Sequence, residues 1–356
     1  MFDSIRTVQV HTSPAYTVSI GSGLLQRCGE MLRETLGLCR VAVITDSNVA
    51  GLYLPIVEDS LRNAGFSVRT HVFPAGEANK NMETLSDILE FLAEERLTRT
   101  DAIVALGGGV CGDMAGFAAA TYLRGVRYVQ MPTTVLSAVD SSVGGKTAID
   151  LKAGKNLAGA FLQPAAVLCD TDCIASLPAA VFADGAAEAI KTGVLSDETL
   201  FSLFENASRT TPPAEIITRC VAYKAGVVER DEKEQGERKL LNLGHTVGHA
   251  IEKCSGYSIP HGHAVAAGLA IIARSAERLG WTEEPIAARI AACLEKHRLP
   301  TSTTYSAAEL ASAASADKKR AGSDITLVIP KKIGVCELRK LPVQDLQAII
   351  AAGLED

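Results

Sequence analysis

The sequence has 356 residues, of which 47% are hydrophobic and 21% are charged, and its formal net charge is −6. A single hydrophobic core stops growing near ~250–300 residues, so we expect two domains. The composition excludes a disordered or fibrous chain. The net negative charge argues against a nucleic-acid partner, because such binders carry clustered lysine and arginine.

The nine cysteines and the N-terminal segment bear on where the protein works. The cysteines include no CxxC pair, which disfavours a disulfide ladder or a Cys₄ zinc site and favours reduced thiols. The N-terminal MFDSIRTVQV lacks a basic patch before an apolar stretch, and no apolar run reaches the ~18–20 residues that span a bilayer. We therefore expect a cytoplasmic protein without a membrane partner.

The first half of the chain alternates β-branched runs with helical patterns. The runs at 41–45, 67–72, 102–106 and 128–131 are expected to be strands. This alternation predicts an α/β layer built on a parallel sheet. An earlier pair of runs, 7–11 and 16–20, is separated by Ser13 and Pro14 and predicts an antiparallel hairpin at one edge.

The second half changes character after Cys173. Helical periodicity rich in Ala, Leu and Glu runs from 179 to 316, and a β-branched run returns only at 325–329. Residues 263–273 are apolar almost all round, as expected of a helix buried at a domain centre. We expect an α/β domain over 1–173 and a mainly helical domain over 174–356. Prolines that suit helix junctions stand at 178, 212, 213, 260 and 300.

A glycine-rich segment, Gly-Gly-Gly-Val-Cys-Gly-Asp at 107–113, directly follows the strand expected at 102–106. Glycines at a strand-to-helix junction let a phosphate approach the backbone N–H groups at a helix N-terminus. The letters fit a dinucleotide fingerprint, but the acidic residue expected ~20 positions later is missing, so a turn without a ligand remains an alternative. Asp46 follows the strand at 41–45 and is a candidate for binding a ribose hydroxyl.

Gly144-Gly145-Lys146-Thr147 looks like the end of a phosphate-binding P-loop. The first glycine of that motif would fall at Asp140, whose carboxylate would repel a phosphate. This excludes a P-loop nucleotidase. Asp140 and Lys146 are instead interpreted as paired ionisable groups beside a glycine turn, with a solvated surface loop as the alternative.

Four of the seven histidines lie within residues 245–263. His245 and His249 are four positions apart, so on a helix they share a face and can converge on one cation. Catalytic zinc sites use three protein ligands and keep one position open. Glu188, one helical turn before Lys191, is the candidate carboxylate ligand. The spacing leaves open which three residues bind, and the absence of Glu within the HxxxH pair argues against a zinc peptidase.

Cationic side chains recur beside these motifs. In an acidic protein, such clustering predicts a pocket for a multiply anionic small molecule. The side chains are those of Arg124, Lys146, Lys155, Lys191, Lys224, Arg238, Lys318 and Lys319.

Taken in order, these motifs resemble those of the 3-dehydroquinate synthase family of sugar-phosphate cyclases, from about residue 41 to 334. The resemblance implies an N-terminal Rossmann-like nucleotide-binding domain, a C-terminal helical metal-binding domain and an active site in the cleft between them. The matching segments are 107–113, Pro132-Thr133-Thr134, Asp140-Ser-Ser-Val-Gly-Gly-Lys146, Gly154-Lys155-Asn156, Glu188-x-x-Lys191, Leu241-Asn242-x-Gly-His245-x-x-Gly-His249 and His261-Gly262.

The resemblance also implies roles for single residues. It makes Glu188, His245 and His261 the ligands of Zn²⁺ or Co²⁺ and leaves His249 on the substrate side. NAD⁺ would be held by Asp46, Glu77, Lys80, Gly108, Gly109, Asp113, Thr133, Thr134, Lys146 and Lys155, with Cys173 and Ser176 on the adenine side in place of the family's Phe and Thr. The substrate would meet Lys146, Lys155, Asn156, Lys191, Lys224, Arg238, Asn242 and one of Lys318 or Lys319. Asp140 would orient a lysine or a water, and Arg124 would reach the phosphate, within the chain or across a homodimer interface.

The implied reaction converts 3-deoxy-D-arabino-heptulosonate 7-phosphate into 3-dehydroquinate and phosphate. Its steps are a transient oxidation by NAD⁺, phosphate elimination, reduction, ring opening and an intramolecular aldol closure. Arg238, Asn242, His249 and the Lys318-Lys319 pair favour this substrate, because they would read its carboxylate and hydroxyls.

Three alternatives remain open. They are a sibling cyclase that makes an inosose, such as 2-deoxy-scyllo-inosose, or a valiolone; a metal- and NAD-dependent polyol dehydrogenase; and a non-catalytic binder. His263 stands where family members often carry Glu; we expect a harmless substitution, and the alternatives are that it alters the surroundings of the metal or offers it a fourth nitrogen.

Overall fold

The computed structural model describes residues 5–206, 213–315 and 324–354, and the chain divides into two compact units. Unit 1 consists of Met1–Leu177 and Pro213–Lys233, and unit 2 consists of Pro178–Pro212 and Glu234–Asp356. The boundary expected after Cys173 lies shortly before the observed division. The segment 213–233, which we expected in the second domain, belongs to unit 1.

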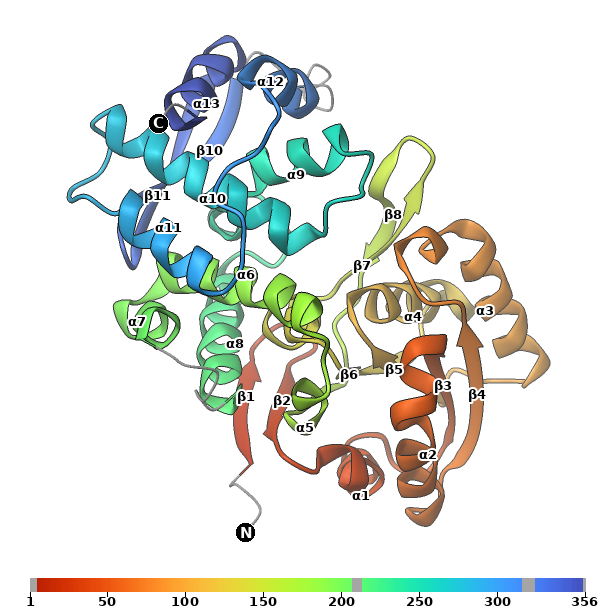
Figure 1. Cartoon of the computed structure of the whole chain (residues 1–356). Helices are drawn as coiled ribbons and strands as arrows, with labels where there is room; N and C mark the ends of the chain where they lie inside the picture. Colours follow the sequence, from red (N-terminus) through yellow and green to blue (C-terminus); the bar gives the residue numbers. More distant parts are fainter. Residues whose placement is uncertain (1–4, 207–212, 316–323, 355–356) are drawn as a thin grey trace. The chain divides into compact units, whose positions relative to one another are not determined.

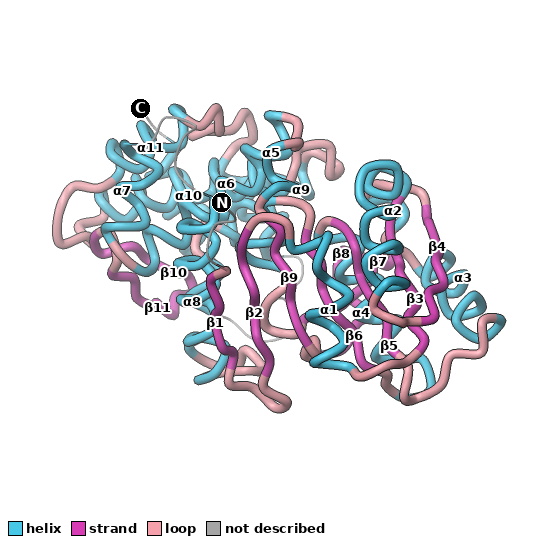
Figure 2. The backbone as a smooth tube through the Cα atoms, turned by 90° about the horizontal axis from the view of Figure 1, so that it is seen from below, coloured by secondary structure: helices cyan, strands magenta, loops and turns pink. Residues whose placement is uncertain are grey.

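Unit 1 is built on a seven-stranded sheet with the strand order β1-β2-β9-β6-β5-β3-β4. All neighbouring pairs are parallel except β1 with β2, which form the expected antiparallel hairpin at the edge (Figure 2). The four strands expected from the sequence are present. The strands of the sheet are β1 (Arg6–Val10), β2 (Tyr16–Gly21), β3 (Arg40–Asp46), β4 (Ser67–Phe73), β5 (Ala102–Gly107), β6 (Arg127–Pro132) and β9 (Ala166–Asp170).

Helices cover both faces of this sheet (Figure 1). Successive side chains of β3 point to opposite faces, as the strand period requires. Val41 and Val43 pack with α1 and α2 on one face, and Ala42 and Ile44 pack with α3 and α4 on the other. The helices of unit 1 are α1 (Leu24–Leu36), α2 (Ser47–Asn63), α3 (Met82–Glu94), α4 (Gly109–Thr121), α5 (Asp172–Ala175) and α8 (Pro213–Arg230), with short turns η1 (Glu77–Asn79), η2 (Tyr122–Arg124) and η3 (Ser137–Ser141).

A second, two-stranded sheet in unit 1 was not expected from the sequence. Strands β7 (Lys146–Leu151) and β8 (Gly154–Phe161) pair antiparallel and pack against α4. The solvated loop considered for the region around Lys146 is therefore an extended hairpin. Its alternating burial is weak, and three of its large apolar side chains, Leu151, Leu157 and Phe161, are exposed, which explains why the pattern gave no clear strand signal.

Helix α8 joins unit 1 although it follows part of unit 2 in the chain. It packs on the edge hairpin, where Glu215 pairs with Arg6 at 2.6 Å and Glu229 accepts a hydrogen bond from the backbone N–H of His11 at 2.8 Å. Sequence patterns report helical character but not the partner on which a helix packs. The single domain boundary that we expected after Cys173 did not allow for a later helix that belongs to unit 1.

Unit 2 is mainly helical, as expected, and contains one hairpin. No disulfide joins any of the described cysteines. The elements are α6 (Ala179–Ser196), α7 (Glu198–Asn206), η4 (Glu237–Asn242), α9 (His245–Cys254), α10 (His261–Arg278), α11 (Ala287–Lys296), α12 (Ala307–Ser315), β10 (Asp324–Lys332), β11 (Val335–Pro342), η5 (Val343–Asp345) and α13 (Leu346–Leu354).

Helix α10 lies at the centre of unit 2 and packs against α6, α9, α11 and α13 (Figure 1). Its residues from Ala264 to Ala273 are all buried, as the apolar pattern of the sequence predicts. Two glycines let neighbouring backbones touch it. A Cβ atom at Gly262 would lie 1.9 Å from the carbonyl oxygen of Asp184 on α6, and one at Gly268 would lie 2.2 Å from the carbonyl oxygen of Gly244 before α9.

None of the described helices combines the length and the apolar composition that a membrane crossing requires.

The close approach of α6 and α10 makes a stability prediction. Gly262→Ala forces a methyl group into the Asp184 carbonyl, so we expect unit 2 to lose about 1–3 kcal/mol or more of unfolding free energy. Gly51→Ala in α2 is the control, because nothing lies within 4 Å of its Cβ position and alanine should stabilise that helix by about 0.5–1 kcal/mol. Thermal unfolding followed by circular dichroism measures both. Equal melting temperatures would contradict the packing argument.

Candidate functional site

Unit 1 carries one group of candidate functional residues, at the turn between β5 and α4. Gly108 is the N-cap of α4, so the first backbone N–H groups of that helix have no helical acceptor. The turn is crowded: a Cβ atom at Gly108 would lie 3.1 Å from Thr134, and one at Gly109 would lie 3.2 Å from Ser141. Thr133 is joined to it by a backbone hydrogen bond to Gly107 at 2.9 Å. The turn is a narrow cradle of the kind that receives a phosphate.

Asp46 lies at the end of β3, the strand next to β5, as expected. Its Oδ1 accepts hydrogen bonds from the backbone N–H groups of Asn48 at 2.9 Å and Val49 at 3.2 Å. The carboxylate therefore caps α2. Both contacts go to Oδ1, which leaves Oδ2 able to accept from a sugar hydroxyl.

A buried ion pair lies beside this turn. The Nζ atom of Lys80 is 2.6 Å from Asp113 Oδ2 and donates to Asn156 Oδ1 at 2.5 Å. Burial alone would lower the pKa of Lys80, but Asp113 and Glu77 outweigh burial and raise it. A second pair joins Lys155 Nζ to Glu77 Oε1 at 3.4 Å. Lys80, Asp113 and Asn156 thus form one contact group, and Lys155 and Glu77 form another. All five were expected to bind the cofactor or the substrate.

Asp140 and Lys224 form a further ion pair in unit 1. The Nζ atom of Lys224 donates to the Asp140 carbonyl at 2.6 Å and to its Oδ1 at 2.5 Å. Lys224 is buried, and it comes from α8, which returns to this unit from far along the chain. From the sequence, Asp140 and Lys146 were interpreted as paired ionisable groups. Lys146 is exposed at the start of β7, on the hairpin that the sequence did not predict.

Cys173 and Ser176 lie at α5, where the sequence analysis placed the adenine side. Their contacts include one residue that the sequence did not single out. The hydroxyl of Tyr53 on α2 bonds to Ser176 Oγ and lies 3.4 Å from the Cys173 carbonyl oxygen. Cys173 itself is buried, and burial raises the pKa of its thiol to about 12, so it is not a reactive thiolate.

Three further cationic residues considered for binding the substrate are Arg124, Lys318 and Lys319. Arg124 is exposed at the end of η2, where both it and Leu123 adopt positive φ values. Lys318 and Lys319 lie outside the described residues, so the structure does not test which of them would meet a substrate.

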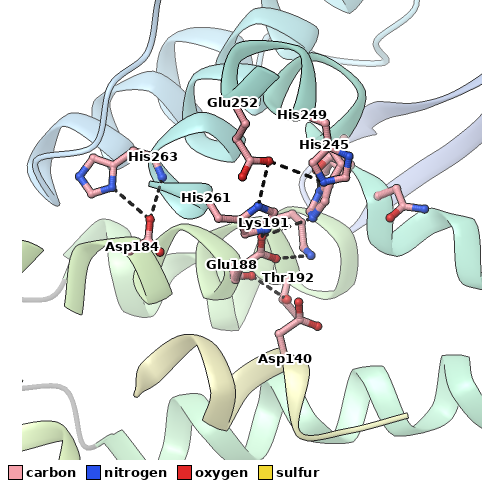
Figure 3. A network of polar contacts seen from close by, with 12 residues as sticks. Asp140, Asp184, Glu188, Lys191, Thr192, His245, His249, Glu252, His261 and His263 are labelled. Carbon is pink, nitrogen blue, oxygen red and sulfur yellow. Dashed lines mark hydrogen bonds and ion pairs between the residues drawn. The ribbon is translucent and has the colours of Figure 1, made fainter. Parts of the chain in front are cut away.

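Unit 2 carries a separate cluster of candidate functional residues. Glu188 on α6, His245 on α9 and His261 on α10 bring one carboxylate and two imidazoles together (Figure 3). Glu188 Oε1 is 3.5 Å from His245 Nε2 and 3.3 Å from His261 Nε2. Their ligand atoms all lie within 4.8 Å of one another. The spacing of the sequence left open which three residues bind, and the packing of α6 against α10 brings Glu188 to the two histidines.

The charges of this cluster are set by burial. The side chain of Glu188 is 1% exposed, and Lys191 on the next turn of α6 is an ion-pair partner. Burial alone would raise the pKa of Glu188, but Lys191 and His245 hold it well below its usual range. Burial lowers the pKa of His245 to about 3. Burial also opposes a charge on His261, but hydrogen bonds to Glu188 and Glu252 outweigh it and raise that pKa to about 10.

The far nitrogen of each imidazole has an acceptor. Nδ1 of His245 lies 3.1 Å from the Leu243 carbonyl oxygen, and Nδ1 of His261 lies 3.3 Å from Glu252 Oε2. Because both partners accept hydrogen bonds, each Nδ1 carries a proton, and each Nε2 is the nitrogen that can bind a metal ion once it has lost its own proton. Glu188 Oε1 faces both Nε2 atoms, and Oε2 pairs with Lys191. A carboxylate oxygen and two imidazole nitrogens aimed at one point fit a divalent metal ion.

The other two histidines of the sequence cluster have different surroundings. His249 is on the same face of α9 as His245, with ring centroids 5.2 Å apart, and its side chain is 60% exposed. Among the described residues, two groups could hold a metal ion, Glu188 with His245 and His261, and His249 with Glu252 and His261; His263 belongs to neither. Its Nδ1 pairs with Asp184 Oδ1 at 3.2 Å, so the idea that it offers a fourth nitrogen to the metal has no support (Figure 3).

Arg238 and Asn242 occupy η4, just before α9. Arg238 is buried, with 1% of its surface exposed. The side-chain amide of Asn242 donates a hydrogen bond to Glu234 Oε1 at 2.9 Å. Glu234 and Glu252 are two acidic residues near the site that the sequence analysis did not find. Glu252 had a signal, because it falls seven positions after His245 on the same helix face.

The fold just described is shared with solved structures of sugar-phosphate cyclases. 2-Deoxy-scyllo-inosose synthase, solved with carbaglucose-6-phosphate, NAD⁺ and Co²⁺, superposes with a TM-score of 0.86 at 24% identity, over 98% of this chain and 100% of that one. 2-epi-5-epi-Valiolone synthase from Streptomyces hygroscopicus subsp. jinggangensis, solved with NAD⁺ and Zn²⁺, has a TM-score of 0.86 at 24% identity, over 95% of this chain and 96% of that one.

Sequence comparison narrows this class. Residues 70–184 match the family model of the 3-dehydroquinate synthase N-terminal domain, and residues 185–320 match that of its C-terminal domain. A 3-dehydroquinate synthase of Neisseria gonorrhoeae is 45% identical over 351 residues, which cover 96% of this chain and 98% of that protein. The chain belongs to the 3-dehydroquinate synthase family.

The Lys80–Asp113 pair gives a prediction for unit 1. Lys80→Met leaves a largely buried carboxylate without its cation, so we expect a loss of about 3–5 kcal/mol of unfolding free energy. The double variant Lys80→Met/Asp113→Asn removes both charges and should regain most of that loss. Thermal unfolding of the two variants without added nucleotide measures the difference. A double variant as unstable as the single one would show that the charge pair is not the cause.

Proposed function

We propose that this chain catalyses the conversion of 3-deoxy-D-arabino-heptulosonate 7-phosphate into 3-dehydroquinate and phosphate, a carbon–oxygen lyase reaction of aromatic amino-acid biosynthesis. Family membership supports the reaction class. The observation that carries the proposal to this chain is the convergence of Glu188, His245 and His261, because a sugar-phosphate cyclase needs an ion at the alcohol that it oxidises.

These three residues would hold the divalent metal, Zn²⁺ or Co²⁺. The fit rests on an ionised buried carboxylate and on two imidazoles whose Nδ1 atoms are already engaged. Two nitrogens and one oxygen suit either ion and leave room for a substrate oxygen. Solved cyclases of the same fold contain Co²⁺ or Zn²⁺.

NAD⁺ would bind at the β5–α4 turn. The cradle of Gly108 and Gly109 and the N-terminus of α4 suit its pyrophosphate. Asp46 at the end of the neighbouring strand suits a ribose hydroxyl. The remaining positions assigned to the cofactor are Glu77, Lys80, Asp113, Thr133, Thr134, Lys146, Lys155, Cys173 and Ser176.

When bound, the metal lowers the pKa of a substrate alcohol and NAD⁺ takes up and later returns a hydride, so the cofactor is unchanged after each turnover. The chain's own residues bind and orient the substrate. The anionic groups of the substrate would be bound by Arg124, Lys146, Asn156, Lys191, Lys224, Arg238, Asn242 and one of Lys318 or Lys319. A flexible keto acid held by such contacts is preorganised for ring closure, an effect that can be worth ~7–11 kcal/mol.

Asp140 would position the Lys224 ammonium, and His249 would position a substrate hydroxyl. Asp140 holds the Lys224 ammonium at 2.5 Å, which fixes this cation rather than allowing it to move with solvent. The exposed imidazole of His249 would orient a substrate hydroxyl.

We further propose that the enzyme works in the cytoplasm as a homodimer. The exposed position of Arg124 supports this assembly, because its side chain remains accessible to a phosphate held by a second copy of the chain.

The ligand assignment predicts different effects for two neighbouring histidines. His245→Ala should lose both bound metal and activity, because it removes one of three ligands, whereas His249→Ala should lose activity and keep the metal. Metal content after gel filtration and phosphate release measure the two properties. Equal metal retention by both variants would overturn the assignment.

The substrate assignment predicts selective turnover. Phosphate release should occur with the heptulosonate phosphate and not with sugar phosphates that lack its carboxylate, such as glucose 6-phosphate. Absorbance at the NADH band should show no net accumulation. A polyol dehydrogenase would accumulate NADH, and a sibling cyclase would release phosphate from one of the other sugars.

A further inference from the structure

We propose that Glu252 is a positioning residue of the metal site, whose carboxylate orients His261 and thereby raises the affinity for the ion. This inference rests on the proposed metal function of Glu188, His245 and His261. It concerns a residue that faces Nδ1 of His261, while Nε2 of the same ring faces Glu188.

Helix α9 places Glu252 where this role requires it. Positions 245, 249 and 252 are separated by four and three residues, so their side chains lie on one face of the helix. Glu252 Oε2 is 3.3 Å from His261 Nδ1 and 3.9 Å from His249 Nε2 (Figure 3). One carboxylate thus reaches the proposed ligand on α10 and the proposed substrate-side histidine on its own helix.

Burial makes the contact with His261 specific. Glu252 is 3% exposed, and a buried carboxylate is costly unless charged or hydrogen-bonding groups surround it. An ionised carboxylate can only accept, so it selects the form of His261 that carries a proton on Nδ1. The other nitrogen, Nε2, then faces Glu188 Oε1 at 3.3 Å. In the metal-free protein a proton lies between these two atoms, and a bound metal ion would take its place.

The two histidine ligands are oriented by different partners. His245 donates to a backbone carbonyl, that of Leu243, at 3.1 Å, whereas His261 faces an anion. A carboxylate behind a histidine fixes its ring and makes it a stronger donor to a metal, and loss of such a partner typically weakens metal binding ~10–100-fold. The structure assigns this effect to His261.

Asp184 and His263 provide a matched control in the same unit. They form a carboxylate–histidine pair of nearly the same length, 3.2 Å between Asp184 Oδ1 and His263 Nδ1, on the same two helices that carry Glu188 and His261. Neither residue belongs to the groups of candidate ligands among the described residues. Loss of this pair tests what a similar contact contributes when it supports packing alone.

The experiment titrates chelator-treated full-length protein with Co²⁺ and follows both the affinity and the visible absorption of the bound ion. Glu252→Gln keeps an acceptor for His261 and loses the charge, so we expect about 10-fold weaker binding. Glu252→Ala loses both and should bind up to ~100-fold more weakly, with an altered absorption spectrum. Asp184→Asn should bind like the unchanged protein. Activity of Glu252→Gln should recover as Co²⁺ is raised to saturation.

The outcomes separate this inference from the proposed function. Unchanged Co²⁺ affinity in both Glu252 variants would refute the positioning role while the metal site stands. Equal weakening in Asp184→Asn would refute it as well, because the effect would then come from packing. Failure of the unchanged protein to bind Co²⁺ would refute the proposed function itself. If Glu252→Ala does not fold, the near-isosteric Glu252→Gln decides the result.

Discussion

The helical unit depends on one costly feature, the ionised carboxylate of Glu188 in an interior that excludes water. A charge in such a place must be compensated by neighbouring groups. Lys191 on the same helix supplies one cation, and the imidazoles of His245 and His261 supply two nitrogens. The arrangement leaves an electron-rich pocket beside a fixed positive charge. A divalent ion resolves that imbalance, and the same ion gives the proposed reaction its Lewis acid.

Glycine is what lets the three helices meet at this point. The backbones of α6 and α9 touch α10 at Gly262 and Gly268, closer than any side chain would permit. His261 immediately precedes Gly262, so the contact that packs the helices also fixes the position of a ligand. Unit 1 uses the same device at Gly108 and Gly109, where a crowded strand-to-helix turn exposes backbone N–H groups. In both units, backbone proximity is as important to the site as side-chain chemistry.

Much of the fold could be predicted from local patterns of apolar and polar residues in the sequence. The strands of the parallel sheet and the central helix α10 were predictable because period and composition report burial, and burial repeats along each element. The β7–β8 hairpin was missed because its apolar residues are largely exposed and do not alternate clearly. The return of α8 to unit 1 was missed because its partners on β1 lie about 200 positions away in the chain, a distance over which no local pattern carries information.

The sequence by itself determined the chemistry: it supplied the glycine turn, the histidine cluster and the cations, and their order indicated the family. Only the tertiary structure decided which of these side chains contact one another. It joined Asp140 to Lys224, placed His263 beside Asp184 and brought Glu252 to His261. The reason is physical, because residue types and spacings fix which groups can react and which helix face they share. The contacts between one element and another arise from packing, which is settled only when the whole chain folds.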